Sequence, residues 1–104
     1  MKTQEDIASE IKSAVLSVDQ SAEIILFGSR ARGDFREDSD WDVLILTDND
    51  EANFRFKKKI RKELFDLQLD VDQVITGIIK NKVVWKQLEH TPFFLEVCKD
   101  GKVL

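Results

Sequence analysis

Residues 24–46, IILFGSRARGDFREDSDWDVLIL, decide how this chain folds. Two runs rich in β-branched and apolar residues, Glu23–Phe27 and Asp40–Leu46, flank a Gly-Ser turn and a charged loop. Such runs, bounded by turn residues, are typical of β-strands. The stretch therefore predicts two neighbouring strands joined by a polar segment.

The polar segment begins with a turn suited to binding phosphate. Gly28 has no Cβ, so the backbone there can approach an anion closely, and Ser29 adds a hydroxyl donor. We expect residues 29–33 to form a helical turn whose free N–H groups favour a negative charge. Arg32, and with it Arg30, can present a planar fork of donors to phosphate oxygens.

The second predicted strand carries a pair of carboxylates. Strand alternation places Asp40 and Asp42 on one face and Trp41 on the other. Two carboxylates on one face can share divalent cations, and hard oxygen ligands suit Mg²⁺. A phosphate turn beside such a pair predicts a site for a nucleoside triphosphate and its metal ions.

Some of the same residues also have simpler interpretations. A Gly-Ser pair alone indicates only a turn, and Asp40 could simply begin a strand. An aspartate within an apolar strand, as at Asp42, is costly without a partner or a metal, which favours function. Arg30 is expected in a solvated turn, paired with acidic residues of the 34–38 loop, whereas Arg32 is expected at the phosphate.

The flanking sequence predicts further helices and a third strand. Residues 68–75, QLDVDQVI, alternate strictly and place Asp70 and Asp72 on one strand face, where either could supply a third carboxylate. A solvent-facing strand edge explains either residue equally well. Helices are expected at Thr3–Val18, Asp48–Asp66, Asn81–His90 and Thr91–Gly101. This order predicts an α/β (α+β) fold, a small mixed sheet with helices packed mainly on one face.

Composition bounds the remaining possibilities. The 104 residues suffice for a single domain, 1–104, and the net charge of −4 argues against broad binding of nucleic acid. No apolar run is long enough to span a bilayer, so no membrane association is expected. The N-terminus lacks the apolar core of a signal peptide, and the single cysteine indicates a reducing compartment. The predicted location is the cytoplasm.

The central motif resembles a known family. Phe27-Gly28-Ser29, ten intervening residues, and then residues 40–43, DWDV, resemble the signature of the DNA polymerase β-like nucleotidyltransferase superfamily. Within it, GSRARG followed by SDWDV is similar to the small MNT proteins, which often pair with HEPN-domain partners. Trp41 departs from the family pattern, where a smaller aliphatic residue is commoner, and Gln73 is more polar than a core strand position should be.

The resemblance implies a role for each matching residue. Gly28 and Ser29 would hold the triphosphate of ATP, and Arg32 would contact its terminal phosphates. Two Mg²⁺ ions would bind Asp40 and Asp42. The third acidic position maps to the predicted third strand, where Asp72 fits the apolar-Asp-x-apolar element better than Asp70.

The function implied is Mg²⁺-dependent transfer of a nucleoside monophosphate, AMP from ATP, to a hydroxyl. For an MNT-type protein the expected acceptor is a tyrosine of a HEPN toxin, and the chain would act as the antitoxin. The alternative is a binding module that neutralises its partner by stoichiometric contact without catalysis. Small-molecule modification, as in antibiotic-modifying relatives, would need an acceptor site from another subunit.

Overall fold

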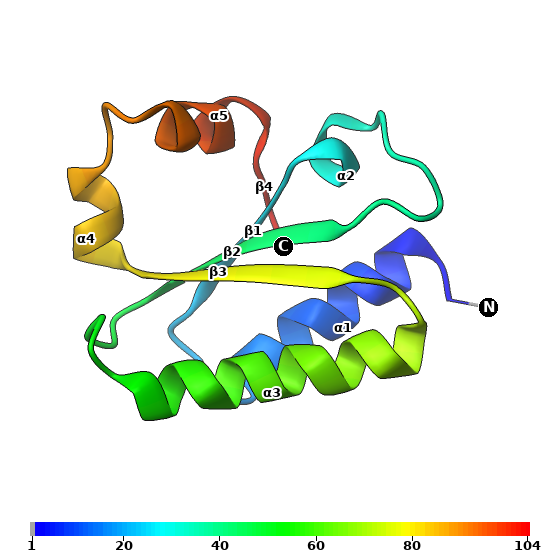
Figure 1. Cartoon of the computed structure of the whole chain (residues 1–104), viewed down its shortest axis with the longest axis horizontal. Coiled ribbons are helices and arrows are strands. Elements are labelled where there is room, and N and C mark those ends of the chain that lie inside the picture. The colour runs from blue at the N-terminus through cyan, green and yellow to red at the C-terminus, as the bar shows by residue number, and fades with distance from the viewer. Residues whose placement is uncertain (1) are drawn as a thin grey trace.

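The computed structural model describes residues 2–104 and forms a sheet with helices on both sides (Figure 1). In chain order the elements are α1 (Gln4–Leu16), β1 (Glu23–Phe27), α2 (Ser29–Arg32), β2 (Trp41–Thr47), α3 (Phe54–Val71), β3 (Ile75–Asn81), α4 (Lys82–Gln87), α5 (Pro92–Asp100) and β4 (Lys102–Val103). The strands lie in the order β3-β2-β1-β4.

The sheet is mixed, as the sequence predicts. β1 pairs antiparallel with β2 and with β4, whereas β2 pairs parallel with β3. The chain crosses from β2 to β3 through α3, the usual way to connect parallel neighbours. β1 and β2 are joined through α2 and the loop that follows it, so the predicted phosphate turn lies at one end of the sheet (Figure 1).

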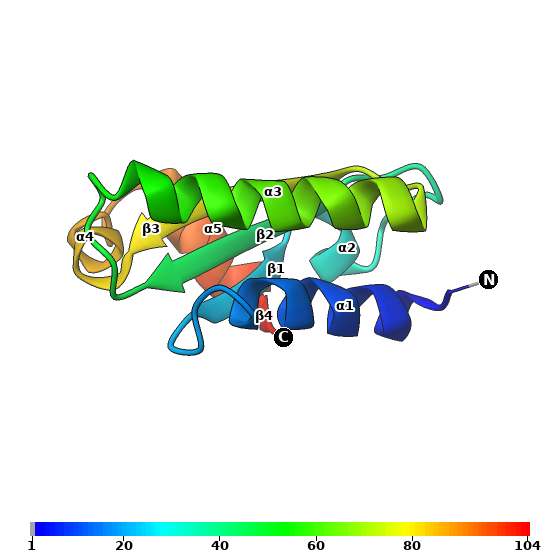
Figure 2. The same cartoon turned by 90° about the horizontal axis from the view of Figure 1, so that it is seen from below.

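The two longest helices cover one face of the sheet. α1 and α3 lie side by side and run in opposite directions, as Figure 2 shows. Their apolar sides meet the inward side chains of β1 and β2, and Ile11, Val15, Val43, Ile45 and Ile60 are fully buried there. The two longest helices therefore lie on one face, as predicted, whereas α4 and α5 pack on the other face.

The shorter helices α4 and α5 cover part of the opposite face. Trp85 of α4 stacks on Phe94 of α5 with ring centroids 4.8 Å apart, and Phe27 and Phe93 meet edge to face at 5.3 Å. This aromatic cluster packs on Leu44 and other β2 side chains that point the same way as Asp42. Asp42 therefore lies at the open end of a face that is otherwise apolar.

The predicted third strand is wrong. Residues 68–71 continue α3, because Leu67 and Val71 extend the helical line of Phe56, Ile60 and Leu64. Asp72 then ends the helix in the left-handed conformation, with φ at 54°. The strand that pairs with β2 follows at Ile75–Asn81, a segment whose pattern is not alternating.

Several helix boundaries follow the predicted caps, and one does not. Thr3 and Asp6 form the expected capping box, and Thr91 caps α5 with Pro92 as its first residue. α3 begins later than predicted because Asn53, and not Asp48, accepts the capping hydrogen bond from the Phe56 N–H. β4 had no strand signal in the sequence.

The open edge of β3 is protected at both ends. The Ile75 N–H donates to Gln68 Oε1 at 2.9 Å, and the Asn81 N–H donates to Glu51 Oε1 at 3.0 Å. Both amides lie on the side away from β2, where an unpaired strand edge would otherwise invite another chain. The side chains of α3 and of the loop before it therefore shield this edge.

A buried hydroxyl at the end of β2 provides the first testable prediction. Thr47 is buried and donates to Asp19 Oδ2 at 2.5 Å. Burial raises the pKa of Asp19, but hydrogen bonds from Thr47 and Ser21 outweigh it and hold the pKa below its ordinary value. Thr47→Val should lower the free energy of unfolding by about 1–2 kcal/mol at pH 7, because Asp19 loses a donor.

The sign of the pH dependence follows from the lowered pKa. The stabilisation is present above the unfolded pKa of about 4 and is lost as pH falls through the folded value. Urea unfolding at pH 7 and at about pH 3 should therefore show a smaller difference between wild type and Thr47→Val in acid. Thr47→Ser, which keeps the hydroxyl, is the control; an equal loss in both variants would contradict the assignment.

Candidate active site

The predicted phosphate turn forms where β1 ends. Gly28 adopts φ 74° and ψ −158°, a conformation that essentially only glycine adopts. Its carbonyl accepts hydrogen bonds from the Ala31 and Arg32 N–H groups at 3.1 Å each. The single helical turn α2 ends at Gly33, which is left-handed with φ at 87°. The prediction of a helical turn opening at the Gly-Ser junction is confirmed.

Asp42, predicted to bind a metal ion, lies directly beside this turn. Asp42 on β2 pairs with Phe27, the last residue of β1, and so its side chain lies against Gly28. A Cβ on Gly28 would come within 2.5 Å of Asp42 Oδ2. The absence of a side chain at Gly28 therefore has two consequences. The backbone can adopt its positive φ, and the Asp42 carboxylate has room beside it.

The charges of the site are not balanced by the chain itself. Burial raises the pKa of Asp42, the neighbouring Asp40 raises it further, and Arg32 opposes both. Within residues 2–104, no hydrogen bond or ion pair reaches the Asp42 carboxylate. Two adjacent carboxylates, one of them half-buried and unpartnered, fit a divalent cation, which would supply the missing positive charge.

Arg32, predicted to contact phosphate, is partly exposed and makes only weak ion pairs. Its side chain is 38% exposed and pairs loosely with Asp34 at 3.3 Å and with Glu96 of α5 at 3.7 Å. Exposed ion pairs of this kind contribute little to stability. A triphosphate can therefore replace these carboxylates at small cost.

Asp70 and Asp72, the two candidates for a third carboxylate, do not lie on a strand as predicted. Asp70 lies on α3 and pairs with Lys2 at 2.9 Å, and Asp72 is the exposed C-cap of α3. The β3 residue paired with Asp42 is Thr76. Nowhere in residues 2–104 do three acidic, histidine or cysteine side chains gather closely enough to hold a metal.

Arg30 is buried, and its predicted place in a solvated turn is wrong. Only 5% of the residue is exposed, and its guanidinium lies 4.6 Å from the Phe35 ring and 4.9 Å from the Trp41 ring. It donates to the Ser39 carbonyl through Nε at 3.2 Å and through Nη2 at 2.9 Å. Arg30 therefore fixes the loop that leads into β2 and does not face solvent.

Gln73 is the residue that sequence reasoning left without a role. Its Oε1 accepts from Trp41 Nε1 at 2.5 Å and from Arg30 Nη2 at 3.3 Å. The signal in the sequence was Trp41, whose indole N–H needs a partner when it is buried. Gln73 lies in the turn after α3 and not on a strand, and its amide oxygen is that partner.

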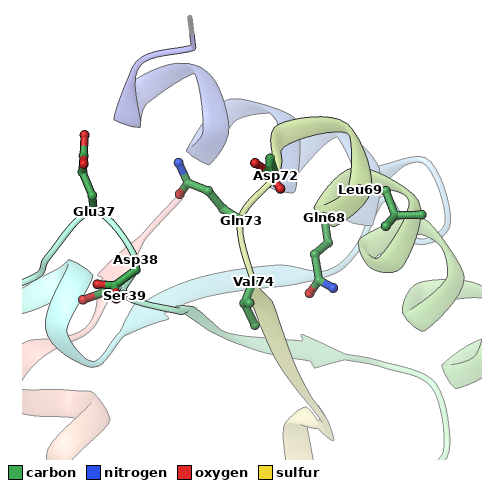
Figure 3. A pocket seen from close by; sticks show the side chains of 8 residues that line it. All are labelled: Glu37, Asp38, Ser39, Gln68, Leu69, Asp72, Gln73 and Val74. Carbon is green, nitrogen blue, oxygen red and sulfur yellow. The ribbon is translucent and has the colours of Figure 1, made fainter.

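A pocket of about 290 Å³ lies next to this network, between the 37–39 loop and the end of α3 (Figure 3). Its lining consists of Glu37, Asp38, Ser39, Gln68, Leu69, Asp72, Gln73 and Val74. Ser39 directly precedes Asp40, but neither Asp40 nor Asp42 lines the pocket. The pocket therefore lies next to Asp40 and Asp42 in the chain but does not contain their side chains.

Comparison with known proteins gives the site its context. The sequence profile of the nucleotidyltransferase domain matches residues 8–96, which include the turn and both carboxylates. The chain belongs to the nucleotidyltransferase domain family. The polymerase β-like fold expected from the central motif is thereby confirmed.

Two curated relatives come from Methanocaldococcus jannaschii. "Putative protein adenylyltransferase MJ0141" is 38% identical over 81 residues, which make up 76% of this chain and 81% of that protein. "Putative protein adenylyltransferase MJ0604" is 36% identical over 81 residues, covering 78% of this chain and 75% of that protein. The aligned residues thus make up most of each relative.

A solved structure shares the fold. It is described as a crystal structure of a toxin-antitoxin with AMP-PNP and has a TM-score of 0.63 at 19% identity, covering 91% of this chain and 69% of that chain. At this identity the likeness concerns the fold alone. Within residues 2–104, no helix of the nucleotidyltransferase domain is long and apolar enough to cross a membrane.

Proposed function

We propose that this nucleotidyltransferase transfers AMP from ATP to a hydroxyl of another protein. The observation that carries the proposal is the contact between Gly28 and Asp42, which brings a phosphate-binding turn against a carboxylate with no partner of its own. Phosphoryl-transfer catalysis consists largely of positioning and charge stabilisation, and both require this proximity.

Each residue of the site has a distinct task in this proposal. The Gly28-Ser29 backbone and the Ser29 hydroxyl bind the triphosphate, and Arg32 draws its terminal phosphates away from the carboxylates. Asp40 and Asp42 hold Mg²⁺, with two ions expected. When bound, the metal neutralises charge on the phosphates and favours departure of pyrophosphate.

The acceptor is proposed from the relatives. Both curated relatives carry the name protein adenylyltransferase, and the structural neighbour is a toxin-antitoxin. We infer that the hydroxyl belongs to a toxin partner, with a tyrosine of a HEPN-domain protein as the specific candidate. The chain would then neutralise the toxin by modifying it.

Intact-mass spectrometry tests this proposal. The chain is incubated with ATP, Mg²⁺ and a small all-helical protein encoded beside it that carries an R-x(4-6)-H motif. One or more adenylyl groups on the partner are expected, and omission of Mg²⁺ should abolish them. An unmodified partner, under conditions in which ATP binds the chain, would contradict the enzymatic proposal.

A second candidate function has a specific observation in its favour. Because no third acidic group joins Asp40 and Asp42 in the part of the chain that the structure describes, the site can bind without completing a reaction. The chain would then neutralise a toxin by contact alone. Asp42→Asn separates the two: neutralisation at unchanged stoichiometry supports contact, and its loss in a variant that still binds the partner supports catalysis.

The third carboxylate remains a proposal that rests on the sequence resemblance. Of the two candidates, Asp72 lines the same pocket as Ser39, the residue before Asp40, whereas Asp70 on α3 pairs with Lys2. If Asp72 accepts the proton of the attacking hydroxyl, Asp72→Asn should slow adenylyl transfer by at least about a hundredfold.

Asp70→Asn is the matched control for this prediction, because it removes one charge two residues away and should change the rate less than about twofold. Initial rates at saturating ATP measure both variants. Equal rates in the two would show that the proton acceptor comes from elsewhere, for instance from the acceptor protein.

A further inference from the structure

A single amide oxygen connects the two halves of the active site. Gln73 lies in the turn between α3 and β3, and its Oε1 accepts from Trp41 Nε1 at 2.5 Å and from Arg30 Nη2 at 3.3 Å. Arg30 belongs to α2, the helical turn that follows Gly28. Trp41, the first residue of β2, lies between Asp40 and Asp42 in the sequence, and its side chain packs on the opposite face of the sheet from Asp42.

Arg30 extends this connection to the backbone of the charged loop. Its Nη2 donates to the Glu37 carbonyl at 3.0 Å, and Nε and Nη2 both reach the Ser39 carbonyl. Its Nη1 donates to Gln4 Oε1 at 2.7 Å, which joins the start of α1 to the same cluster. The buried Arg30 guanidinium is thus hydrogen-bonded within the protein and is not available to bind a phosphate.

The network lies where the fold otherwise provides little support. α2 is only four residues long, and the loop from Asp34 to Asp38 is exposed along its whole length. A buried, charge-assisted cluster of this kind holds its members in one geometry because each would lose a partner by moving. Metal and phosphate sites require placement within about 0.5 Å, so such a support matters for function.

We propose that Gln73 is a positioning residue, which fixes the phosphate-binding turn relative to Asp40 and Asp42 through its hydrogen bonds to Arg30 and Trp41. The proposal rests on the proposed function, in which the turn holds ATP and the carboxylates hold metal ions. Trp41 and Gln73 are brought together only by the folded chain, through this hydrogen bond. Each needs the other, since a buried indole N–H or amide without a partner is costly.

The test compares Gln73→Leu with Gln68→Leu. Both remove a glutamine that lines the same pocket and accepts a hydrogen bond, but Gln68 accepts from the Ile75 N–H, and no hydrogen bond of Arg30 or Trp41 in the described residues involves Gln68. The readout is Mn²⁺ affinity, measured by electron paramagnetic resonance in the presence of α,β-methylene ATP, which is not cleaved between its α and β phosphates. Thermal unfolding of each variant without ligand records the structural effect.

Gln73→Leu should bind Mn²⁺ about tenfold more weakly than wild type, the effect typical of lost support around a metal site. Gln68→Leu should stay within about twofold, although both variants lose stability. Gln73→Glu keeps an acceptor for both donors and should restore affinity. If Gln73→Leu does not fold, Trp41→Phe, which removes the indole donor together with part of a buried ring, should still weaken Mn²⁺ binding by about threefold or more.

Three results would overturn the inference. Folded Gln73→Leu, or Trp41→Phe in its place, could bind Mn²⁺ as tightly as wild type. Gln68→Leu could lose as much affinity as Gln73→Leu, which would indicate a general effect of stability. A wild-type protein that binds neither Mn²⁺ nor the analogue would overturn the proposed function and the inference with it, whereas normal wild-type binding confines any failure to Gln73.

Discussion

Replacing Asp42 by asparagine is expected to reduce nucleotidyl transfer by at least about a thousandfold and, at the same time, to stabilise the protein without ligand. The loss of activity follows because asparagine is a neutral, weak ligand for Mg²⁺, and phosphoryl transfer depends chiefly on electrostatic stabilisation. The gain in stability follows because Asp42 is half-buried beside Asp40 with no partner in the described chain.

The stabilising effect should depend on pH in a defined direction. Burial and the charge of Asp40 raise the pKa of Asp42 above its ordinary value, so the folded protein holds this proton more tightly than the unfolded chain. Stability from this group is therefore present below the unfolded pKa and is lost as pH rises through the folded pKa. Asp42→Asn should exceed wild type in melting temperature at pH 7, and the difference should shrink towards acid.

Asp66→Asn is a suitable control for Asp42→Asn. Asp66 lies exposed on α3 and pairs with Lys62 at 2.9 Å, so its replacement should leave both activity and the pH profile of stability nearly unchanged. Calorimetric unfolding between about pH 4 and pH 8 measures the profile without metal or nucleotide. An Asp42→Asn variant that is less stable than wild type at pH 7 would contradict this account of the site's charges.

Replacing Gly28 by alanine is expected to have the second largest effect. The backbone at Gly28, with φ 74° and ψ −158°, is essentially restricted to glycine, and alanine there should lower stability by about 1–3 kcal/mol. The new Cβ would also lie 2.5 Å from Asp42 Oδ2, so either the turn or the carboxylate must shift. A displacement of that kind should slow transfer by about a hundredfold.

Gly33→Ala separates strain from displacement. Gly33 also has a positive φ, 87°, but a Cβ there would meet nothing within 4 Å. It should therefore lose stability, by about 1–2 kcal/mol, and keep most of its affinity for nucleotide. Urea unfolding and binding of α,β-methylene ATP measure the two effects; equal losses of nucleotide affinity in both variants would show that contact with Asp42 is unimportant.

Local patterns predicted the part of the fold that contains the phosphate turn and the carboxylate pair. β1, β2 and the turn between them were recognisable because each signal is short-range: an apolar run, a glycine, and an alternation that separates Asp42 from Trp41. The relative position of Gly28 and Asp42 then follows from the antiparallel pairing of β1 with β2. The number of residues between the Gly-Ser turn and Asp42 is therefore compatible with their contact in this antiparallel pair.

The third strand could not be found in this way, because two patterns overlap in residues 68–71. The segment alternates like a strand, yet Leu67 and Val71 also continue the apolar side of α3, and packing on the core decides in favour of the helix. The predicted solvent exposure of Arg30 was wrong for a related reason. The charges nearby in sequence suggested solvent, whereas its actual partners include Gln4 and Gln73, which only the folded chain brings together.

The central claim is that Asp40 and Asp42 hold Mg²⁺ against the phosphate turn. Isothermal titration of the chain with α,β-methylene ATP, with and without Mg²⁺, tests it most directly. We expect the wild-type chain to bind the analogue only when Mg²⁺ is present. Asp42→Asn should remain folded but should not bind the analogue. Binding of equal strength without Mg²⁺, or in Asp42→Asn with Mg²⁺, would contradict the claim.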